Sequence, residues 1–426
     1  MHLLLTGASG YIGTHILAAA RARGWTVTIL AHRPGPEAPG VRRLPWSLNG
    51  PVPDAAFAPF DDAGPVEAVV HLAHQWSVEG EEASDINVIG SHALLAAART
   101  HGVARFVFGS SISARPKALN RYGRVKAAVE RQLTGPGEVA ARIGLVYGGS
   151  RQAMWGTLCR IAGLAPVVPM LTPWREVQPV HLDDLCEGLL RLAGAPAPGA
   201  GPFVLGDPDP VPFGRFLALL ARHLHGRPLL VVPLPLTPIL LLLRLVNAIP
   251  FLPNIERERV LGLAGITVVP SRDSLTRLGL TLRPLAAALA AERPDRRRVL
   301  LLEARTLLTY VLEAPPRPGL IRRYVRAAKA YGSAVPLPLP APATRWPALL
   351  RLLEPLPGCQ SAGARQVRER LHVAALIADA SPEGAAKTFA YAPEGAGRAL
   401  LRLGTAGALE ALALPVRWLL SALVWR

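Results

Sequence analysis

The sequence predicts an α/β protein built on a doubly wound parallel sheet, and three observations lead to this prediction. Over residues 1–150, short apolar runs alternate with stretches in which apolar residues recur at helical spacing. The runs are continuously apolar, as in VVHL and RFVF, which is typical of strands covered by helices on both faces. A glycine-rich turn, TGASGYIG, joins the first run to the first helical stretch.

Each element of this region is placed from its own pattern of apolar residues. Five runs are expected to be strands: His2–Thr6, Thr26–Ala31, Ala68–Leu72, Arg105–Phe108 and Val139–Ile143. Three stretches between them are expected to be helices: Ile12–Arg23, Ile86–Thr100 and Tyr122–Leu133.

The pattern changes twice along the chain. Residues 1–150 are expected to form the sheet domain, and residues 151–290, where prolines multiply, a smaller substrate-binding lobe of the same unit. Residues 291–426 are expected to form a basic and mostly α-helical region, to which the sequence assigns no role. This last region carries 20 basic and 10 acidic side chains and therefore holds most of the chain's excess positive charge.

Composition excludes several classes of protein. The chain has 426 residues, of which 50% are hydrophobic and only 18% charged, which is too apolar for a disordered chain despite a net charge of +17. Three widely spaced cysteines do not make a disulfide framework or a metal site, so we expect a cytoplasmic protein. No uninterrupted run of about 20 apolar residues occurs, which argues against a membrane-spanning helix.

The glycine-rich turn, residues 6–13, is the strongest chemical signal. It follows a strand and opens a helix, so its glycines let the backbone approach a pyrophosphate while the helix N-terminus offers free N–H groups. The alternative is a plain glycine turn between a strand and a helix.

A second signal combines a tyrosine, a lysine and a serine. Tyr122 and Lys126 are four residues apart and share one face of the predicted helix, where the cation is expected to lower the pKa of the phenol toward working pH. Such a tyrosine could act as general acid and base for a carbinol proton. Ser111, with Ser110 as the near alternative, ends the preceding strand and could bind a substrate oxygen. Taken singly, the tyrosine and lysine could be a pair on the protein surface, and the serine could be a turn residue or a helix cap.

In this order, the motifs resemble the short-chain dehydrogenase/reductase superfamily, in particular its extended branch of epimerase/dehydratase-like proteins with a Rossmann-type fold. The resemblance extends from residue 1 to about 285 and does not include the C-terminal region. It is carried by TGASGYIG (6–13), VVHLAH (69–74), NVIGSHALLAAA (87–98), RFVFGSS (105–111), YGRVK (122–126), ARIGLVYGG (141–149) and PVHLDDL (179–185).

The resemblance implies a role for each matching residue. Tyr122 matches the catalytic acid/base, Lys126 the lysine that holds the nicotinamide ribose, and Ser111 the hydroxyl that orients the substrate oxygen. The positions that match the cofactor site are Gly7, Gly10, Tyr11, Ile12, Gly13, Leu72 and Ala73, together with Tyr122 and Lys126. The implied reaction is reversible hydride transfer between nicotinamide and a carbinol or ketone carbon.

The second strand indicates which nicotinamide cofactor is used. An acidic residue at its end would bind the ribose 2′-hydroxyl of NAD, whereas an arginine accommodates the 2′-phosphate of NADP. Here the strand ends in Leu-Ala-His-Arg, so Arg33 favours NADP over NAD, although it could also be a solvated loop cation.

Two departures from the family bear on the substrate. The segment between Ser111 and Tyr122 is short and lacks a VYG element, and Pro45-Trp46-Ser47-Leu48 replaces a pair of one aspartate and one hydrophobic residue that the family has near the adenine. These departures disfavour a nucleotide sugar. The leucine- and proline-rich residues 228–253 would suit a lipid-like substrate, or would simply pack in the core. No metal site is expected at two further motifs: the pair His71 and His74, and the group of His181, Asp183 and Asp184.

Residues 291–426 are interpreted from their arginine and leucine content. Arginines alternate with leucines, with Trp418 and Trp425 near the end, as in helices that lie on an anionic membrane surface. The alternative is a helical addition packed on the rest of the chain or on a second subunit, as in a homodimer. No concentrated cationic stripe is evident, which makes nucleic acid an unlikely partner.

Three functions are therefore weighed. The first is an NAD(P)-dependent oxidoreductase acting on a small or lipophilic alcohol or ketone. The second is a nucleotide-sugar epimerase or dehydratase that retains its NAD(P). The third is a non-catalytic nucleotide-binding scaffold or assembly subunit, which the intact serine, tyrosine and lysine set disfavours.

Overall fold

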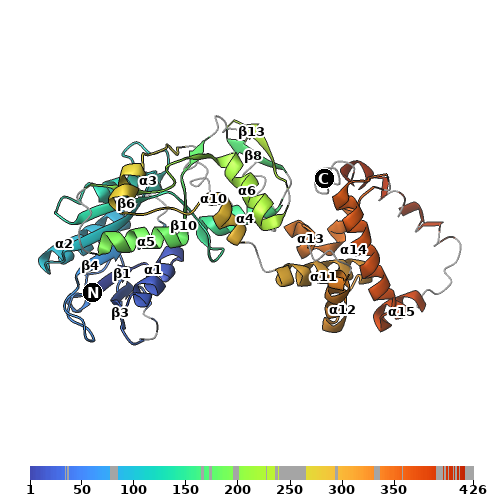
Figure 1. Cartoon of the computed structure of the whole chain (residues 1–426), viewed down its shortest axis with the longest axis horizontal. Helices are drawn as coiled ribbons and strands as arrows, with labels where there is room; N and C mark the ends of the chain where they lie inside the picture. Colours follow the sequence, from blue (N-terminus) through green and yellow to red (C-terminus); the bar gives the residue numbers. More distant parts are fainter. Residues whose placement is uncertain are drawn as a thin grey trace. The chain divides into compact units, whose positions relative to one another are not determined.

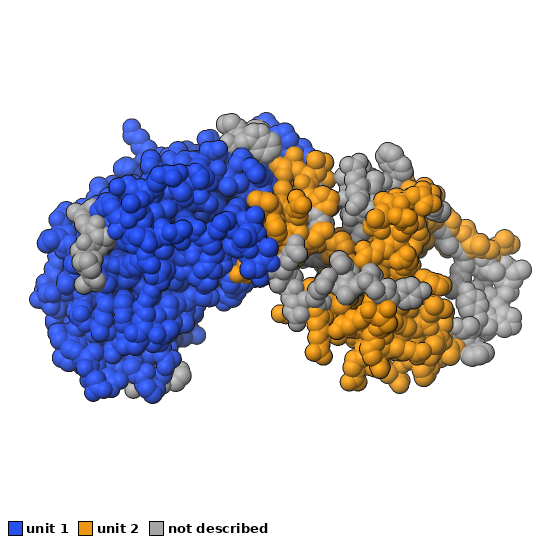
Figure 2. All heavy atoms as spheres, in the orientation of Figure 1, with its two compact units in different colours: residues 1–158, 169–216, 232–291 blue, residues 159–168, 217–231, 292–426 orange. Residues whose placement is uncertain are grey.

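The computed structural model describes the larger part of the chain. The described residues are 1–33, 35, 38–76, 85–164, 167–171, 175–194, 201–226, 228–235, 238, 265–292, 296–330, 336–356, 358–389 and separate residues between 397 and 417. The chain divides into two compact units, coloured blue and orange in Figure 2. The first unit comprises residues 1–158, 169–216 and 232–291, and the second residues 159–168, 217–231 and 292–426.

A seven-stranded parallel sheet forms the centre of the first unit. Its strand order is β11-β6-β5-β4-β1-β2-β3. The strands are β1 (His2–Thr6), β2 (Thr26–Ala31), β3 (Val41–Pro45), β4 (Ala68–His71), β5 (Arg105–Ser111), β6 (Glu138–Ile143) and β11 (Phe203–Leu205). The predicted fold class and all five predicted strands are confirmed. The sequence did not show β3, which carries two arginines, or β11, which is only three residues long.

Helices cover the sheet in two pairs. The pairs are α1 (Tyr11–Ala22) with α5 (Leu182–Ala193), and α2 (Ile86–Thr100) with α3 (Arg121–Glu130), as can be followed in Figure 1. The strand order changes direction between β1 and β4, so the segments that follow these two strands meet at one end of the sheet. In doubly wound sheets this crevice is where ligands bind.

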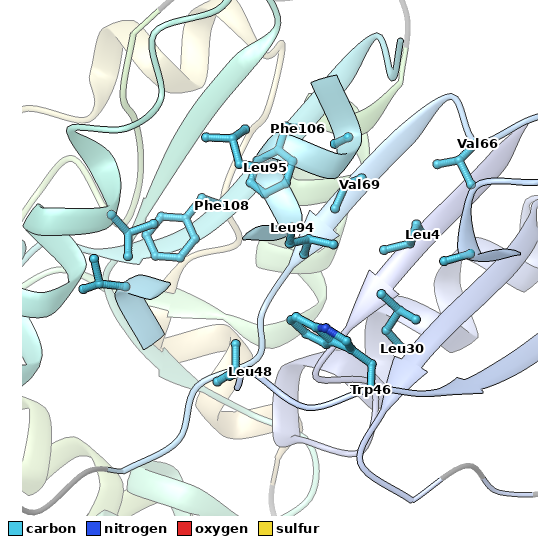
Figure 3. Packing of buried hydrophobic residues seen from close by; sticks show 14 of the residues in the cluster. Leu4, Leu30, Trp46, Leu48, Val66, Val69, Leu94, Leu95, Phe106 and Phe108 are labelled. Atoms are coloured by element: carbon cyan, nitrogen blue, oxygen red, sulfur yellow. The ribbon is translucent and has the colours of Figure 1, made fainter. Parts of the chain in front are cut away.

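One buried cluster holds the sheet to α2 and α3, as Figure 3 shows. Alternate strand residues, among them Leu4, Val69 and Phe106, pack against Leu94 and Leu95 of α2, because side chains two apart in a strand share a face. Trp46 and Leu48 belong to the same cluster. The segment that replaces the expected pair of an aspartate and a hydrophobic residue therefore contributes these two side chains to the core.

Shorter elements complete the first unit, and some of these helices and strands begin in one unit and end in the other. They are β7 (Leu145–Tyr147), α4 (Ala153–Leu164), β8 (Val167–Leu171), β9 (Glu176–Val177), β10 (Pro179–His181), β12 (Val211–Pro212), α6 (Phe213–His225), β13 (Leu230–Leu234), α9 (Arg272–Arg277) and α10 (Leu285–Ala291), with a 3-10 turn at Asp54–Ala56. Of the leucine- and proline-rich residues 228–253, residues 236, 237 and 239–253 lie outside the described residues.

The second unit is mainly a helical bundle, as predicted. Its long helices α11 (Arg296–Leu312), α12 (Pro318–Ala330) and α14 (Ala362–Asp379) pack on one another. The shorter α13 (Ala341–Arg345), a 3-10 helix (Pro347–Leu352) and α15 (Pro382–Phe389) complete the described part. Trp418, Trp425 and Tyr331 lie outside the described residues. Among the described residues, no helix combines the length and the apolar character needed to cross a bilayer.

A buried carboxylate orders the bundle. Glu303, which is 1% exposed, accepts hydrogen bonds from the Tyr324 hydroxyl and the Leu337 amide, both at 2.7 Å. The Arg370 guanidinium lies 3.7 Å from the same carboxylate. Because both oxygens of Glu303 have partners, the bundle tolerates a charge in its core.

Candidate functional site

The glycine turn between β1 and α1 is packed too tightly for any side chain. Gly7 has a φ of +72°, and a Cβ atom there would lie 2.8 Å from the Ala73 nitrogen. A Cβ on Gly13 would overlap the carbonyl oxygen of Gly7. Glycine at these positions therefore lets α1 begin directly against the ends of β1 and β4.

The first turn of α1 suits an anion. Gly10 at the N-cap provides no side-chain cap, and no acidic residue lies in the first turn. Gly10 is exposed, so the free N–H groups and the positive end of the helix dipole are available to a pyrophosphate. Tyr11 can contribute only its backbone, because its hydroxyl donates a 2.5 Å hydrogen bond to the carbonyl of Gly148. Ile12 follows it in the first turn, half-buried.

A buried hydrogen-bond network fixes the backbone at Leu72 and Ala73. The Thr6 hydroxyl oxygen accepts from both of their amides at 3.1 Å and contacts Nδ1 of His71 at 2.7 Å. His71 Nε2 lies 2.9 Å from the Ser91 hydroxyl, and burial lowers the pKa of His71 to about 3. Both ring nitrogens have a partner if His71 is neutral, with Nδ1 accepting a hydrogen bond from the Thr6 hydroxyl and Nε2 donating one to the Ser91 hydroxyl. Sequence reasoning missed Thr6, although its place at the end of a buried strand was visible.

Arg33 lies just beyond the end of β2. It is exposed, and with the described residues it forms no ion pair or hydrogen bond. The three residues Ala31, His32 and Arg33 include no acid that would bind a ribose hydroxyl. The guanidinium is therefore available to a 2′-phosphate.

The structure separates the two serines at the end of β5. Ser110 is 2% exposed and its hydroxyl donates to Glu130, which also forms a 2.6 Å ion pair with Arg142. Ser111 points to the opposite side of the strand and is half-buried. Its hydroxyl lies 2.9 Å from that of Ser113. Ser110 is committed to a structural pair, so Ser111 is the serine available to a substrate.

Tyr122 and Lys126 occupy the first turns of α3, which packs on β5. Lys126 is 3% exposed; its side-chain nitrogen donates a 2.7 Å hydrogen bond to the Gly109 carbonyl and lies 5.6 Å from the centre of the Tyr122 ring. The structure thus brings the predicted tyrosine and lysine to the strand that carries Ser111. Their catalytic roles stay predictions.

The pKa of Tyr122 does not shift as expected. Burial raises it to about 12, rather than lowering it toward neutrality. Burial also lowers the pKa of Lys126 to about 7, although Glu130 acts in the opposite direction. The expected effect of the lysine fails because both groups are desolvated, and because an amine with this pKa carries only part of its charge at neutral pH. Without cofactor, Tyr122 is therefore protonated at neutral pH.

Two residues next to Tyr122 were not expected to belong to the site. Trp76 stacks on the Tyr122 ring at a centroid distance of 5.4 Å, yet is 61% exposed. His74 meets the edge of the same ring at 5.0 Å, and burial together with Lys126 lowers its pKa to about 3. His74 forms no hydrogen bond with the described residues. A large aromatic residue shortly after the β4 motif was the only sequence signal for this cluster.

The other histidine and acidic motifs are structural. His181 caps α5, since its Nδ1 accepts a hydrogen bond from the Asp183 amide at 3.2 Å. Asp183 and Asp184 instead bind Arg283 at 3.0 and 2.9 Å. Within the described part of the chain, no group of three or more potential ligands could hold a metal ion.

Comparison with known proteins finds a matching family model and several relatives. Residues 3–206 match the family model "NAD dependent epimerase/dehydratase family". The chain is also 33% identical to a UDP-glucose 4-epimerase of Klebsiella pneumoniae over 125 residues, 26% of this chain and 89% of that protein. The chain belongs to this family. The match ends before residues 292–426, which contain the helical bundle.

Other family relatives carry different names. A ceramide reductase of Caulobacter vibrioides is 29% identical over 198 residues, 46% of this chain and 62% of that protein. A ketoreductase of Stigmatella aurantiaca, named for a farnesyl-bearing dihydroquinoline oxide, is 28% identical over 52% of this chain and 72% of its own length. The chain thus spans less than two thirds of the ceramide reductase, and 23% of three uncharacterised mycobacterial relatives.

Solved structures of the family share the fold. A UDP-glucose 4-epimerase of Thermotoga maritima with UDP-glucose has a TM-score of 0.51 and 19% identity, over 68% of this chain and 97% of that one. A human epimerase family protein with NADPH has a TM-score of 0.51 and 21% identity, over 69% of this chain and all of that one. Identity at this level indicates the fold alone.

Proposed function

We propose that this chain is an NAD(P)H-dependent oxidoreductase that interconverts a ketone and an alcohol on a lipid-like substrate. The observation that carries the proposal is that Tyr122 and Lys126 lie on the first turns of α3, against the strand whose end presents Ser111. The neighbouring glycine turn and the uncapped start of α1 fit a dinucleotide pyrophosphate.

The proposed mechanism assigns one task to each residue. A bound nicotinamide supplies or accepts the hydride. The Ser111 hydroxyl holds the substrate oxygen, and the Tyr122 hydroxyl donates a proton to it as the carbonyl becomes an alcohol. Lys126, held by Gly109, positions the cofactor ribose, and its protonated form stabilises the tyrosinate that results.

NADPH is the proposed cofactor. The support is Arg33 at the end of β2, which is exposed and has no partner among the described residues, at the position where a family member selective for NAD would place an acid. Family membership is compatible with either nicotinamide, so this choice depends on that arginine.

A lipid-like substrate is favoured by two observations. Trp76 offers an exposed aromatic surface directly on Tyr122, which suits an apolar chain. Two relatives are named for a ceramide and for a farnesyl-bearing compound. The second candidate, a nucleotide-sugar epimerase with retained cofactor, is supported by the epimerase relative.

Cofactor titration followed by turnover tests the proposal. Trp76 lies beside Tyr122, so intrinsic tryptophan fluorescence should report binding, tighter for NADPH than for NADH. A panel of long-chain ketones should then give net oxidation of the preferred cofactor. Tightly bound cofactor with no net oxidation, together with conversion of a UDP-sugar, would instead identify the epimerase. Failure to bind any nicotinamide would contradict both functions.

A further inference from the structure

The helical unit, residues 159–168, 217–231 and 292–426, exposes several large apolar side chains. Leu301 and Leu302 on α11 are 38% and 47% exposed. Near the end of the chain, three leucines are 69% to 71% exposed: Leu400, Leu401 and Leu403. Exposed leucines at neighbouring positions of one helix, such as Leu301 and Leu302, indicate a surface with a partner.

Cations flank the exposed leucines of α11. Arg298 and Arg305 are exposed, and their positions in the helix place them on the same face as Leu301 and Leu302. The opposite face of α11 is buried in the bundle through Leu300, Ala304 and other core residues. With the described residues, the side chains of Arg298 and Arg305 form no ion pair.

Helix α12 presents a second basic face. Arg322, Arg323, Arg326 and Lys329 are all exposed and lie within about a third of the helix circumference. Tyr324 and Val325 point away from them into the core. None of the four cations forms an ion pair or hydrogen bond with the described residues, and α12 contains no acidic residue.

Four acids of this unit form ion pairs with arginines that lie outside α12. Glu354 and Glu410 pair with Arg417, Glu383 with Arg317, and the buried Glu303 with Arg370. Among the described residues, the α12 cations thus have no acidic partner. A polyanion provides the complementary charge.

We propose that the helical unit docks on an anionic phospholipid bilayer through the basic faces of α11 and α12 and the exposed leucines. A membrane satisfies both features, because headgroups bind the cations while leucines enter the boundary with the acyl chains. A nucleic acid would leave the leucines in water. Docking goes beyond the reaction proposed above and does not depend on it.

Co-sedimentation of the full chain with vesicles tests this proposal. We expect binding to phosphatidylcholine vesicles that contain phosphatidylglycerol, weakened by salt, and little binding to phosphatidylcholine alone. The double variant R322Q/R326Q should lower the partition coefficient about 30-fold, since each cation near the surface contributes roughly a factor of five. A second variant, R323Q/K329Q, should have a similar effect if the first one is poorly folded. L301S/L302S should weaken binding at high salt as well.

A matched control removes two exposed cations from the first unit. Arg21 and Arg131 also lack ion pairs among the described residues, and R21Q/R131Q should bind vesicles as the unaltered chain does. The proposal is overturned if the full chain binds no vesicles, or if all variants bind equally. It is also overturned if the chain binds duplex DNA or RNA more tightly than vesicles and R322Q/R326Q abolishes that binding.

Discussion

The side-chain nitrogen of Lys126 lies 2.7 Å from the carbonyl oxygen of Gly109, so the lysine is anchored to β5 rather than free to move. The same nitrogen lies 4.5 Å from the centre of the Phe108 ring. Burial against these groups disfavours the charged amine and lowers its pKa from 10.5 to about 7. The site therefore holds a buried amine whose protonation should affect stability.

The free energy of unfolding should rise with pH above 7 because of Lys126. Between about pH 7 and 10.5 the unfolded lysine binds a proton that the folded one has lost, so the slope of stability against pH is positive. Relative to K126M, the unaltered chain should gain about 2 kcal/mol between about pH 7.5 and 9.5. Denaturant melts of both proteins at each pH measure the difference, and parallel pH profiles would contradict it.

Arg33 should discriminate between the two nicotinamide cofactors. R33A should raise the Kd for NADPH about tenfold to a hundredfold, because a charge-assisted bond to the 2′-phosphate is lost, while the Kd for NADH stays the same. R21A removes another exposed arginine and is the matched control. Equal losses for NADPH and NADH would contradict this role.

Trp76 should determine affinity for the apolar part of the substrate. W76A should raise KM for a long-chain ketone about tenfold, with a smaller change in kcat, since the indole contacts the chain and not the reacting carbon. W76F should retain most of the affinity. Trp346 in the helical unit is also exposed, and W346A is the control. An equal increase in KM for short and long ketones in W76A would contradict a role for Trp76 in binding the apolar chain.

Thr6 should stabilise the turn that meets the cofactor. T6V removes the acceptor of the Leu72 and Ala73 amides and should lower the free energy of unfolding by about 2–4 kcal/mol. T6S keeps the hydroxyl and should lose much less. Thermal melts distinguish the two variants, and equal melting temperatures would show that the network contributes little.

The central strands of the sheet could be predicted because they are continuous apolar runs. The two edge strands, β3 and β11, could not be predicted. Val41–Pro45 carries Arg42 and Arg43, and Phe203–Leu205 is too short to show a pattern. The motif residues that follow β1, end β5 and begin α3 could also be identified in the sequence, because their spacing is set by these strands and this helix.

Properties that depend on packing were beyond the sequence. Whether Ser110 or Ser111 faces the site depends on the pairing of Ser110 with Glu130 on another element. The pKa of Tyr122 was expected to fall, but burial outweighs the neighbouring amine. Trp76 stacks on Tyr122 across 46 residues of chain, a contact that no local pattern indicates.

The most direct test of the proposed reaction follows deuterium from NADPH labelled at the transferable position of its nicotinamide. With a long-chain ketone substrate, mass spectrometry should find the label on the carbinol carbon of the alcohol, and Y122F should slow its appearance at least a hundredfold. No transfer of the label, or transfer at an unchanged rate in Y122F, would contradict the account.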